Sequence, residues 1–182
     1  MPEVSIVVRT FNEEKHLPAL LTSIKNQTYR DSEIVIVDSG SFDSTCEIAE
    51  RLADRLVHIN SQDFTFGYSL NTGIDASEGK LIAVVSAHTL PIDAKWLEQL
   101  TMPFRHERTA MTFGRQFGAP KSKFGEAQDL RRTYGSAPQR LHPNKIFANN
   151  ANSALRKELW AKHKFDETLL GLEDAEWAKY WM

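Results

Sequence analysis

The chain has 182 residues, of which 41% are hydrophobic and 25% are charged, and its formal net charge is -2. This length is enough for one domain with a full hydrophobic core. With 22 basic and 24 acidic residues, there is no electrostatic case for nucleic-acid binding. The single cysteine, Cys46, excludes an internal disulfide and is typical of a reducing compartment. Neither a signal-peptide pattern nor an apolar run of about 20 residues is present. We therefore expect a cytoplasmic protein without a transmembrane segment.

Strand and helix patterns alternate through the first hundred residues. Four short runs rich in Val, Ile and Leu have the pattern of buried strands: 4–8, 33–38, 56–60 and 81–85. Three stretches between them have helical spacing: 17–27, a segment opening near Ser44, and 67–77. Ser44 and Glu47 have the spacing of a capping box, and Gly79 is expected to stop the third helix. The alternation predicts an α/β fold with a mostly parallel sheet flanked by helices.

The second half of the chain is less regular. A helix is expected at 93–100, a fifth strand at 110–117, and a last helix at 172–182. The segment 118–145 is polar and rich in Gly, Pro, Arg and Lys, which predicts a mobile loop or short helices. The chain ends on a large apolar group. Because natural termini are usually polar, we expect either a tightly docked helix or a domain cut from a longer protein, and we favour the second.

Polar residues follow the predicted strands at the edge where open α/β sheets bind ligands. They are Thr10, Asn12, Glu13, Asp38, Ser39, Ser41, Ser86 and His88. An acidic pair, Glu173 and Asp174, opens the last predicted helix. A Gly-x-Gly-x-x-Gly fingerprint and a Walker loop are missing, which argues against dinucleotide-dependent hydride transfer and P-loop chemistry, and no Cys/His spacing resembles a zinc motif. Gly67–Asn71 falls one residue short of a nucleophile elbow.

The order and spacing of three segments resemble the family 2 glycosyltransferases, which are inverting enzymes of the GT-A-type fold that use nucleotide-diphosphate sugars. The segments are 4–13, 33–45 and 71–79, and the resemblance extends over nearly the whole chain. It implies one catalytic domain over residues 1–182, with a nucleotide-binding half (about 1–100) and an acceptor-side half (about 101–182). It also implies a UDP- or TDP-sugar donor, a carbohydrate or lipid-linked acceptor, and cell-surface polysaccharide synthesis, with peripheral association at the inner face of the membrane.

The resemblance assigns roles around the nucleotide. Thr10 and Phe11 match positions beside the nucleobase, where the Phe11 ring offers a stacking face. Asp38 matches the carboxylate that accepts the N3–H of uracil or thymine, and both bases carry that proton. Glu13 and Ser41 match positions that contact ribose or base. The complete set of implied donor-binding residues is Thr10, Phe11, Asn12, Glu13, Asp38, Ser41, Asn71, Ser86, Ala87 and His88.

On the acceptor side, Asp174 matches the base that deprotonates the acceptor hydroxyl. A carboxylate at a helix N-terminus is held ionised by the helix dipole, and exclusion of water raises its basicity. Glu173 is rotated by about 100° from Asp174 on the helix, so it faces the acceptor or the protein interior. Asn150 and Asn152 are expected to line the acceptor side of the pocket, with an amide-rich turn as the alternative.

The chain departs from the family at the metal-binding motif. The family usually has Asp-x-Asp at the end of the fourth strand, where this chain has Ser86-Ala87-His88. Ser86 can still bond a ribose hydroxyl, and His88 is the implied ligand of Mn²⁺ or Mg²⁺. Imidazole suits Mn²⁺ better, because Mg²⁺ prefers oxygen. A protonated His88 that contacts phosphate directly is the alternative.

A second departure is Leu70, where the family often has an arginine near the diphosphate. Arg9, Arg115 or a lysine from 118–145 are the candidates for the missing cation. The Ser-Ala-His motif, together with Gly114-Arg115-Gln116, also resembles a rhamnosyltransferase-like subset of the family.

Two other classes of protein stay open. A catalytically silent nucleotide-sugar-binding module would explain the departures, whereas retention of Asp38 and Asp174 argues against it. A nucleotidyltransferase is the third possibility, because that activity would require a Gly-rich phosphate loop, which this sequence lacks. Cys46, in a predicted helix, is expected to be a small buried apolar residue and not a nucleophile.

Overall fold

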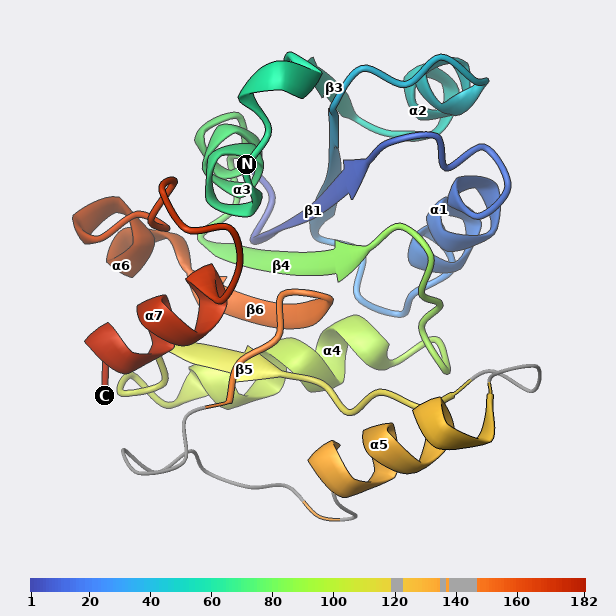
Figure 1. Ribbon diagram of the computed structural model, residues 1–182. Helices are drawn as coiled ribbons and strands as arrows, with labels where there is room; N and C mark the ends of the chain where they lie inside the picture. Colours follow the sequence, from blue (N-terminus) through green and yellow to red (C-terminus); the bar gives the residue numbers. More distant parts are fainter. Residues whose placement is uncertain (119–122, 135–136, 138–146) are drawn as a thin grey trace.

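The fold is a six-stranded sheet with helices on both faces, seen in a computed structural model that describes residues 1–118, 123–134, 137 and 147–182 (Figure 1). The strands are β1 (Val4–Thr10), β2 (Ser32–Asp38), β3 (Arg55–His58), β4 (Leu81–Ser86), β5 (Met111–Phe113) and β6 (Asn152–Arg156). Their order is β3-β2-β1-β4-β6-β5. The first four are parallel, and β6 runs antiparallel to both β4 and β5. The predicted α/β class, with a largely parallel sheet, is confirmed.

The helices follow the predicted alternation. They are α1 (Leu17–Lys25), α2 (Thr45–Leu52), α3 (Phe66–Asp75), α4 (Trp96–Thr101), α5 (Phe124–Tyr134), α6 (Lys157–Lys162) and α7 (Glu173–Tyr180), with short 3-10 turns at Ser61–Asp63 and Met102–Arg105. Among the described residues, none of them is long and apolar enough to cross a bilayer. Helix α5 falls in the segment predicted as loop or short helix, and the rest of that prediction lies mostly outside the described residues.

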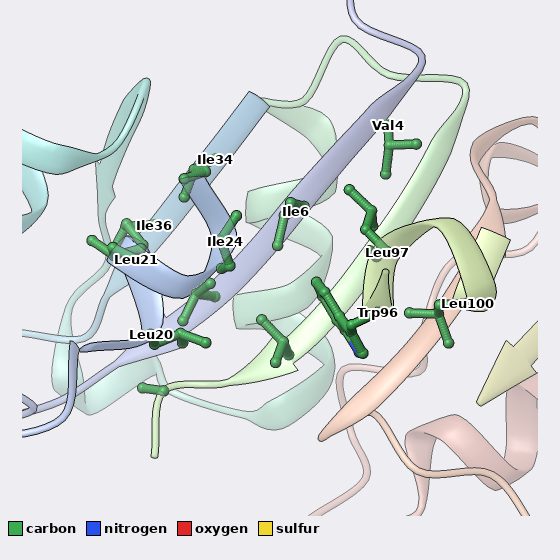
Figure 2. Packing of buried hydrophobic residues seen from close by; sticks show 14 of the residues in the cluster. Val4, Ile6, Leu20, Leu21, Ile24, Ile34, Ile36, Trp96, Leu97 and Leu100 are labelled. Carbon is green, nitrogen blue, oxygen red and sulfur yellow. The ribbon is translucent and has the colours of Figure 1, made fainter. Parts of the chain in front are cut away.

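One face of the sheet packs against α1, α2 and α4. Figure 2 shows Leu20, Leu21 and Ile24 of α1 against the β1 and β2 side chains, with Trp96 and Leu97 of α4 beside them. Leu20 and Leu21 have no exposed surface. Burying a side chain of this size stabilises the fold by roughly 1.5–3 kcal/mol. The apolar spacing that predicted these helices is therefore the spacing of their core contacts.

The other face packs against α3, α6 and α7, with Trp177 of α7 fully buried. Helix α3 lies very close to the sheet at Gly73. A Cβ there would be 2.7 Å from methyl groups of both Val7 and Val37. This close approach fixes α3 against the two strands that lead to the polar edge.

Three local predictions need correction, two about helix ends and one about the length of a strand. Ser44 precedes α2, but its side chain makes no capping bond; the Asp43 carboxylate accepts the Thr45 N–H at 3.0 Å instead. Gly79 does not stop α3, which ends at Asp75. A Cβ on Gly79 would lie 2.5 Å from the Ser5 nitrogen, so its small size serves a close approach. The fifth strand spans only Met111–Phe113.

Candidate functional site

The ends of β1, β2 and β4 lie level at one edge of the sheet. Thr10 is the register partner of Asp38, and Arg9 is the partner of Ser86. Side chains alternate along a strand, so these residues divide between the two faces. Thr10 and Asp38 point to the face of α1 and α2, whereas Arg9 and Ser86 point to the face of α3 and α7. The edge thus carries two adjoining polar regions.

Asp38 is held by hydrogen bonds on both of its carboxylate oxygens. Oδ1 accepts the backbone N–H groups of Gly40 at 3.0 Å and Ser41 at 2.8 Å. Oδ2 accepts the hydroxyls of Thr10 at 3.0 Å and Ser41 at 2.5 Å. Burial alone would raise the pKa of Asp38, but the bonds from Ser41 and Thr10 outweigh it and lower the pKa. Gly40 makes the turn with a φ of +89°, which disfavours other residues there.

The loops after β1 and β2 are tied together by Asn12 and Glu13. The Asn12 N–H donates to the Ser41 Oγ at 2.8 Å, and the Asn12 side-chain oxygen accepts the Phe42 N–H at 3.0 Å. The Glu13 N–H donates to the Thr45 Oγ1 at 2.7 Å. Asn12 adopts a left-handed φ of 55° to make these bonds. Its side chain is used to position the loops, and it therefore serves the predicted donor site indirectly.

Two exposed aromatic rings stand at this pair of loops. Phe11 is 52% exposed and Phe42 is 85% exposed, and their centroids are 6.2 Å apart in an edge-on arrangement. Exposed aromatic side chains supply stacking faces for a nucleobase. Phe11 was predicted from the sequence. Phe42 was missed as a contact because its nearness to Phe11 depends on the packing of the two loops.

His88 is paired with Glu13 across the edge. The His88 Nδ1 lies 3.0 Å from the Glu13 Oε1, and the His88 side chain is 64% exposed. A turn closed by the Thr89 N–H and hydroxyl on the Ser86 carbonyl, at 3.1 and 2.9 Å, presents this imidazole. The pairing leaves Nε2 for a ligand. A histidine whose other nitrogen bonds a carboxylate is the usual arrangement at a metal, so these residues fit a single-histidine contact.

Asp174 is the second residue of α7. The Asn150 N–H donates to its Oδ2 at 3.0 Å, and the Ala175 N–H donates to its Oδ1 at 2.7 Å. Leu172, just before the helix, has a left-handed φ of 67°. Burial is the largest influence and raises the pKa of Asp174, and the neighbouring Glu173 charge raises it further, against the effect of the backbone bonds. The carboxylate is more basic than an ordinary aspartate.

The predicted acceptor-side residues hold this helix in place. Asn150 and Glu173 are 3% and 5% exposed, and the Asn150 Nδ2 donates to the Glu173 Oε1 at 3.3 Å. The Asn150 Oδ1 accepts the Ser153 hydroxyl at 2.9 Å, and the Asn152 Oδ1 accepts the Trp96 Nε1–H at 2.9 Å. Asn150 and Glu173 are buried and paired with each other, which supports Asp174, and Asn152 is tied to α4 through Trp96; a contact of these three residues with the acceptor stays a prediction.

Asn71 uses its whole side-chain amide for hydrogen bonds inside the protein. Its Nδ2 donates to the Phe165 carbonyl at 2.9 Å and to the Glu167 Oε1 at 2.8 Å. Its Oδ1 accepts the Trp160 Nε1–H at 2.9 Å and the Phe165 N–H at 3.1 Å. Two donors and two lone pairs exhaust the amide. Asn71 therefore links α3 to α6 and the segment before α7, and a contact of its amide with the donor would require one of these bonds to break.

The cation that Leu70 does not supply is best matched by Arg9. Leu70 is buried in the core, and the Arg9 guanidinium lies 4.7 Å over the Phe66 ring. Burial lowers the pKa of Arg9, while the Glu173 and Asp174 carboxylates oppose that lowering. The guanidinium therefore interacts electrostatically with the acidic pair of the site. Arg115 is exposed and lies over the Phe117 ring at 4.5 Å.

Three further side chains complete the surroundings. Ala87 is 2% exposed and contributes no polar side chain. Tyr134 of α5 accepts the Asn149 Nδ2–H at 3.0 Å, and burial raises the pKa of Tyr134 to about 12. Cys46 is partly exposed, and burial with the adjacent Asp38 raises the pKa of its thiol to about 11, which disfavours a nucleophilic role. Tyr134 was missed because it comes from the irregular segment.

The chain matches the family model described as Glycosyl transferase family 2 over residues 5–163. It is 27% identical to the putative glycosyltransferase EpsH of Bacillus subtilis, in an alignment that covers 96% of this chain and 53% of EpsH. Among solved structures, the mannosyltransferase PcManGT from Pyrobaculum calidifontis, in complex with GDP-Man and Mn²⁺, superposes with a TM-score of 0.72 and 20% identity over 99% of this chain and 52% of that one. TarS of S. aureus in complex with UDP-GlcNAc gives a TM-score of 0.74 and 19% identity over 97% and 52%.

At this level of identity the two structures share the fold, which confirms the predicted GT-A-type architecture. The chain spans about half the length of EpsH, and of both solved proteins.

Proposed function

The chain belongs to glycosyl transferase family 2, and from this premise we propose that it moves a sugar from a UDP- or TDP-sugar to an acceptor hydroxyl with inversion. The observation that carries the proposal is Asp174, a partly buried carboxylate of raised pKa at the edge where β1, β2 and β4 end. Arg9 and Ser86 share its face of the sheet. The nucleotide-binding half is about 1–100 and the acceptor-side half about 101–182.

The nucleobase is proposed to bind at Phe11, Phe42 and Asp38. Asp38 is fully buried and accepts four hydrogen bonds, so one of them must give way to a base N3–H. Thr10 is the group that can move, because its hydroxyl also lies 3.4 Å from the Val37 carbonyl. We infer that this hydroxyl turns to Val37 when a pyrimidine binds. Ser41 and the backbone N–H groups then keep the carboxylate ionised.

His88 is the residue that would hold a divalent cation, through Nε2, together with diphosphate oxygens. Such a cation supplies Lewis-acid stabilisation of the negative charge on the diphosphate. Mn²⁺ suits an imidazole ligand better than Mg²⁺ does, and the similar PcManGT structure contains Mn²⁺. Glu13 orients the ring and favours its Nδ1-protonated form. Arg9 adds a fixed positive charge on the same edge.

Transfer is proposed to begin at Asp174. Its carboxylate takes the proton of the acceptor hydroxyl, and that oxygen forms a bond to the anomeric carbon. The bond from this carbon to the diphosphate oxygen breaks on the opposite side, and its electron pair leaves with the nucleoside diphosphate. A carboxylate of raised pKa is a stronger base, which suits this step. Attack from the opposite side inverts the sugar carbon.

The acceptor is proposed to be a carbohydrate or lipid-linked hydroxyl in cell-surface polysaccharide synthesis, at the cytoplasmic face of the membrane. This part rests on the family resemblance. For the donor sugar, the corresponding proposal is the one used by the rhamnosyltransferase-like subset of the family.

The alternative is a catalytically silent module that binds nucleotide sugars, and His88 in place of an aspartate favours it. Calorimetric titration of UDP, TDP and GDP, with and without Mn²⁺, separates the cases when paired with an assay for hydrolysis of the matching sugar nucleotides. We expect UDP or TDP to bind and the sugar nucleotide to be hydrolysed slowly. Binding without any hydrolysis or transfer would favour the silent module, and absence of binding to every diphosphate would overturn both.

A further inference from the structure

Three metal-ligating side chains of different chemistry meet beside the base-binding region. Asp38 ends β2 and His58 ends β3, and the two are register partners on neighbouring parallel strands. Cys46 is the second residue of α2. One ligand atom from each of the three lies within 4.8 Å of the other two. In the part of the chain that the structure describes, this is the one place where three such groups converge.

The three side chains of this cluster differ in how deeply they are buried. The Cys46 sulfur and a carboxylate oxygen of Asp38 lie within 4.8 Å of each other, so both can reach one ion placed between them. Asp38 has no exposed surface, whereas His58 is exposed and Cys46 partly so. The cluster is thus anchored by a rigid carboxylate inside the protein. It opens to solvent on the imidazole side, which provides an entry path.

We propose that Asp38, Cys46 and His58 form a binding site for a thiophilic transition metal of the Zn²⁺ class. A thiolate, an imidazole and a carboxylate are the protein ligands that Zn²⁺ takes, and three of them leave the fourth tetrahedral position to water. Such a set does not suit Mg²⁺, which prefers oxygen. The site differs from the one proposed at His88, which follows β4, in its residues, in its place after β2 and β3, and in the metal it selects.

Binding needs only small movements. Ligand atoms of a tetrahedral zinc site stand roughly 3.3–3.8 Å apart, so the three side chains approach one another by about 1 Å. The thiol loses its proton to solvent, and the thiolate sulfur forms a bond to the metal. The Asp38 oxygen that turns to the metal gives up the Thr10 hydroxyl, which has the Val37 carbonyl 3.4 Å away as a second acceptor.

Sharing of Asp38 makes the metal and the nucleotide competitors. This consequence rests on the proposed function, in which the same carboxylate accepts the N3–H of a pyrimidine. An oxygen that coordinates the metal cannot at the same time accept that proton without loss. Zn²⁺ at this site is therefore an inhibitor of donor binding, in contrast to Mn²⁺ at His88.

Cobalt titration of the whole chain tests the site directly. Co²⁺ replaces Zn²⁺ in such sites and gives a near-ultraviolet charge-transfer band when a thiolate coordinates it. The chain has one cysteine, so any such band reports Cys46. We expect one Co²⁺ per chain, loss of the band in Cys46→Ser, and at least about tenfold weaker Co²⁺ binding in His58→Ala, the usual cost of removing a ligand or its partner. Zn²⁺ should displace Co²⁺ and abolish the band.

The controls separate this site from the donor site. His106→Ala, an exposed histidine elsewhere, and His88→Ala should both leave the band and its affinity unchanged. A titration without a thiolate band, or a band indifferent to His58→Ala, would overturn the proposal. In a second arm, UDP should raise the Co²⁺ concentration at which the thiolate band forms, and a band that forms at the same Co²⁺ concentration with saturating UDP would overturn the competition. If UDP binds to metal-free protein and no Co²⁺ band forms, the metal site fails while the proposed function stands. If the Co²⁺ band forms and UDP does not bind, the proposed function fails while the metal site stands.

Discussion

At Asp174, burial and hydrogen bonding act in opposite directions. Burial and the Glu173 charge raise the pKa, while the Asn150 and Ala175 N–H groups lower it, and the net direction is upward. The sequence predicts a carboxylate held ionised by the helix dipole and made more basic by exclusion of water, and in the structure burial has the largest effect on its pKa. The result is a base stronger than a surface aspartate, with its geometry fixed by Asn150.

We expect Asp174→Asn to lower turnover by about 10²–10⁴-fold, the usual contribution of a general base. Affinity for UDP should stay within about threefold, because Asp174 lies on the acceptor side of the proposed site; threefold corresponds to roughly 0.7 kcal/mol. Single-turnover transfer and calorimetry measure the two quantities. Unchanged turnover would remove Asp174 from the base role.

The folded-state pKa of Asp174 is raised, so its ionised form is disfavoured by folding. Its contribution to stability is present below the unfolded pKa and is lost as pH rises through the folded value. Asp174→Asn should therefore unfold at an equal or higher urea concentration than the native chain at pH 7.

For the native chain, turnover should fall on the acid side at a pH above the ordinary aspartate value of about 3.9. A profile flat from pH 4 to 8 would contradict this.

Glu13 and His88 form a pair that neither residue suggests alone. The family resemblance implies a ribose or base contact for Glu13, and the structure pairs it with a histidine 75 positions away. We expect His88→Ala to remove the Mn²⁺ dependence of UDP binding. Glu13→Gln should weaken the affinity for Mn²⁺ by about 10–100-fold, as for an outer-shell carboxylate. His106→Ala serves as the matched control. UDP binding by His88→Ala that responds to Mn²⁺ as the native chain does would exclude the metal contact.

At the scale of elements, Asn71 shows how α3 is fixed to the C-terminal half. Its four hydrogen bonds reach groups at positions 160–167, up to 96 residues away. Asn71→Ala would leave the Trp160 and Phe165 N–H groups unpaired. We expect a loss of roughly 2–4 kcal/mol in the free energy of unfolding, because each buried unpaired group costs about 1–3 kcal/mol.

Donor binding separates a structural Asn71 from a functional one. The folded Asn71→Ala protein should bind UDP within about twofold of the native affinity, a change of roughly 0.4 kcal/mol. Thr72→Ala is the control, since the Thr72 hydroxyl bonds only its own helix at Tyr68. Native stability combined with lost UDP binding would restore Asn71 to the donor site.

The elements that the sequence predicts well are those whose signal is local. The strand runs and the α1 spacing follow from residues a few positions apart, and the structure places β1, β2, β4 and α1 within two residues of their predicted bounds. The antiparallel β6, the Glu13–His88 pair and the burial of Asn150 depend on contacts across the chain. An asparagine has the same local appearance whether it lines a pocket or ties two helices together, so amide side chains were the weakest predictions.

At the scale of the whole molecule, the sheet has a polar network at each end of its parallel strands, one at the edge that carries the site and one at the opposite edge, where the strands begin. At the edge opposite the site, Glu33 Oε1 accepts the Ser5 hydroxyl at 2.5 Å and the Glu78 N–H at 2.6 Å, and Arg55 pairs with Glu33 and Glu78. This network ties β1 and β2 to the turn before β4. One edge thus holds the strands in register, and the other carries the site.

The opposite edge makes the fold sensitive to acid. Burial alone would raise the pKa of Glu33, but the hydrogen bonds from Ser5, Glu78 and Arg55 outweigh it and lower the pKa, as the bonds to Asp38 do at the site. A lowered folded-state pKa gives stability that is present above the unfolded value of about 4 and is lost as pH falls through the folded value. We expect Glu33→Gln to unfold more easily by roughly 1–3 kcal/mol at pH 7.

That difference should shrink as the pH falls below about 4, because the unfolded carboxyl is then protonated and the lowered folded-state pKa no longer gives its full stability. Urea unfolding of the native chain and Glu33→Gln at pH 7, 5 and 3 measures it, with exposed Glu50→Gln as the control. A constant difference at all three values would mean that Glu33 acts through packing and not through its charge. A shrinking one would assign part of the acid sensitivity of the whole fold to the edge that the site does not use.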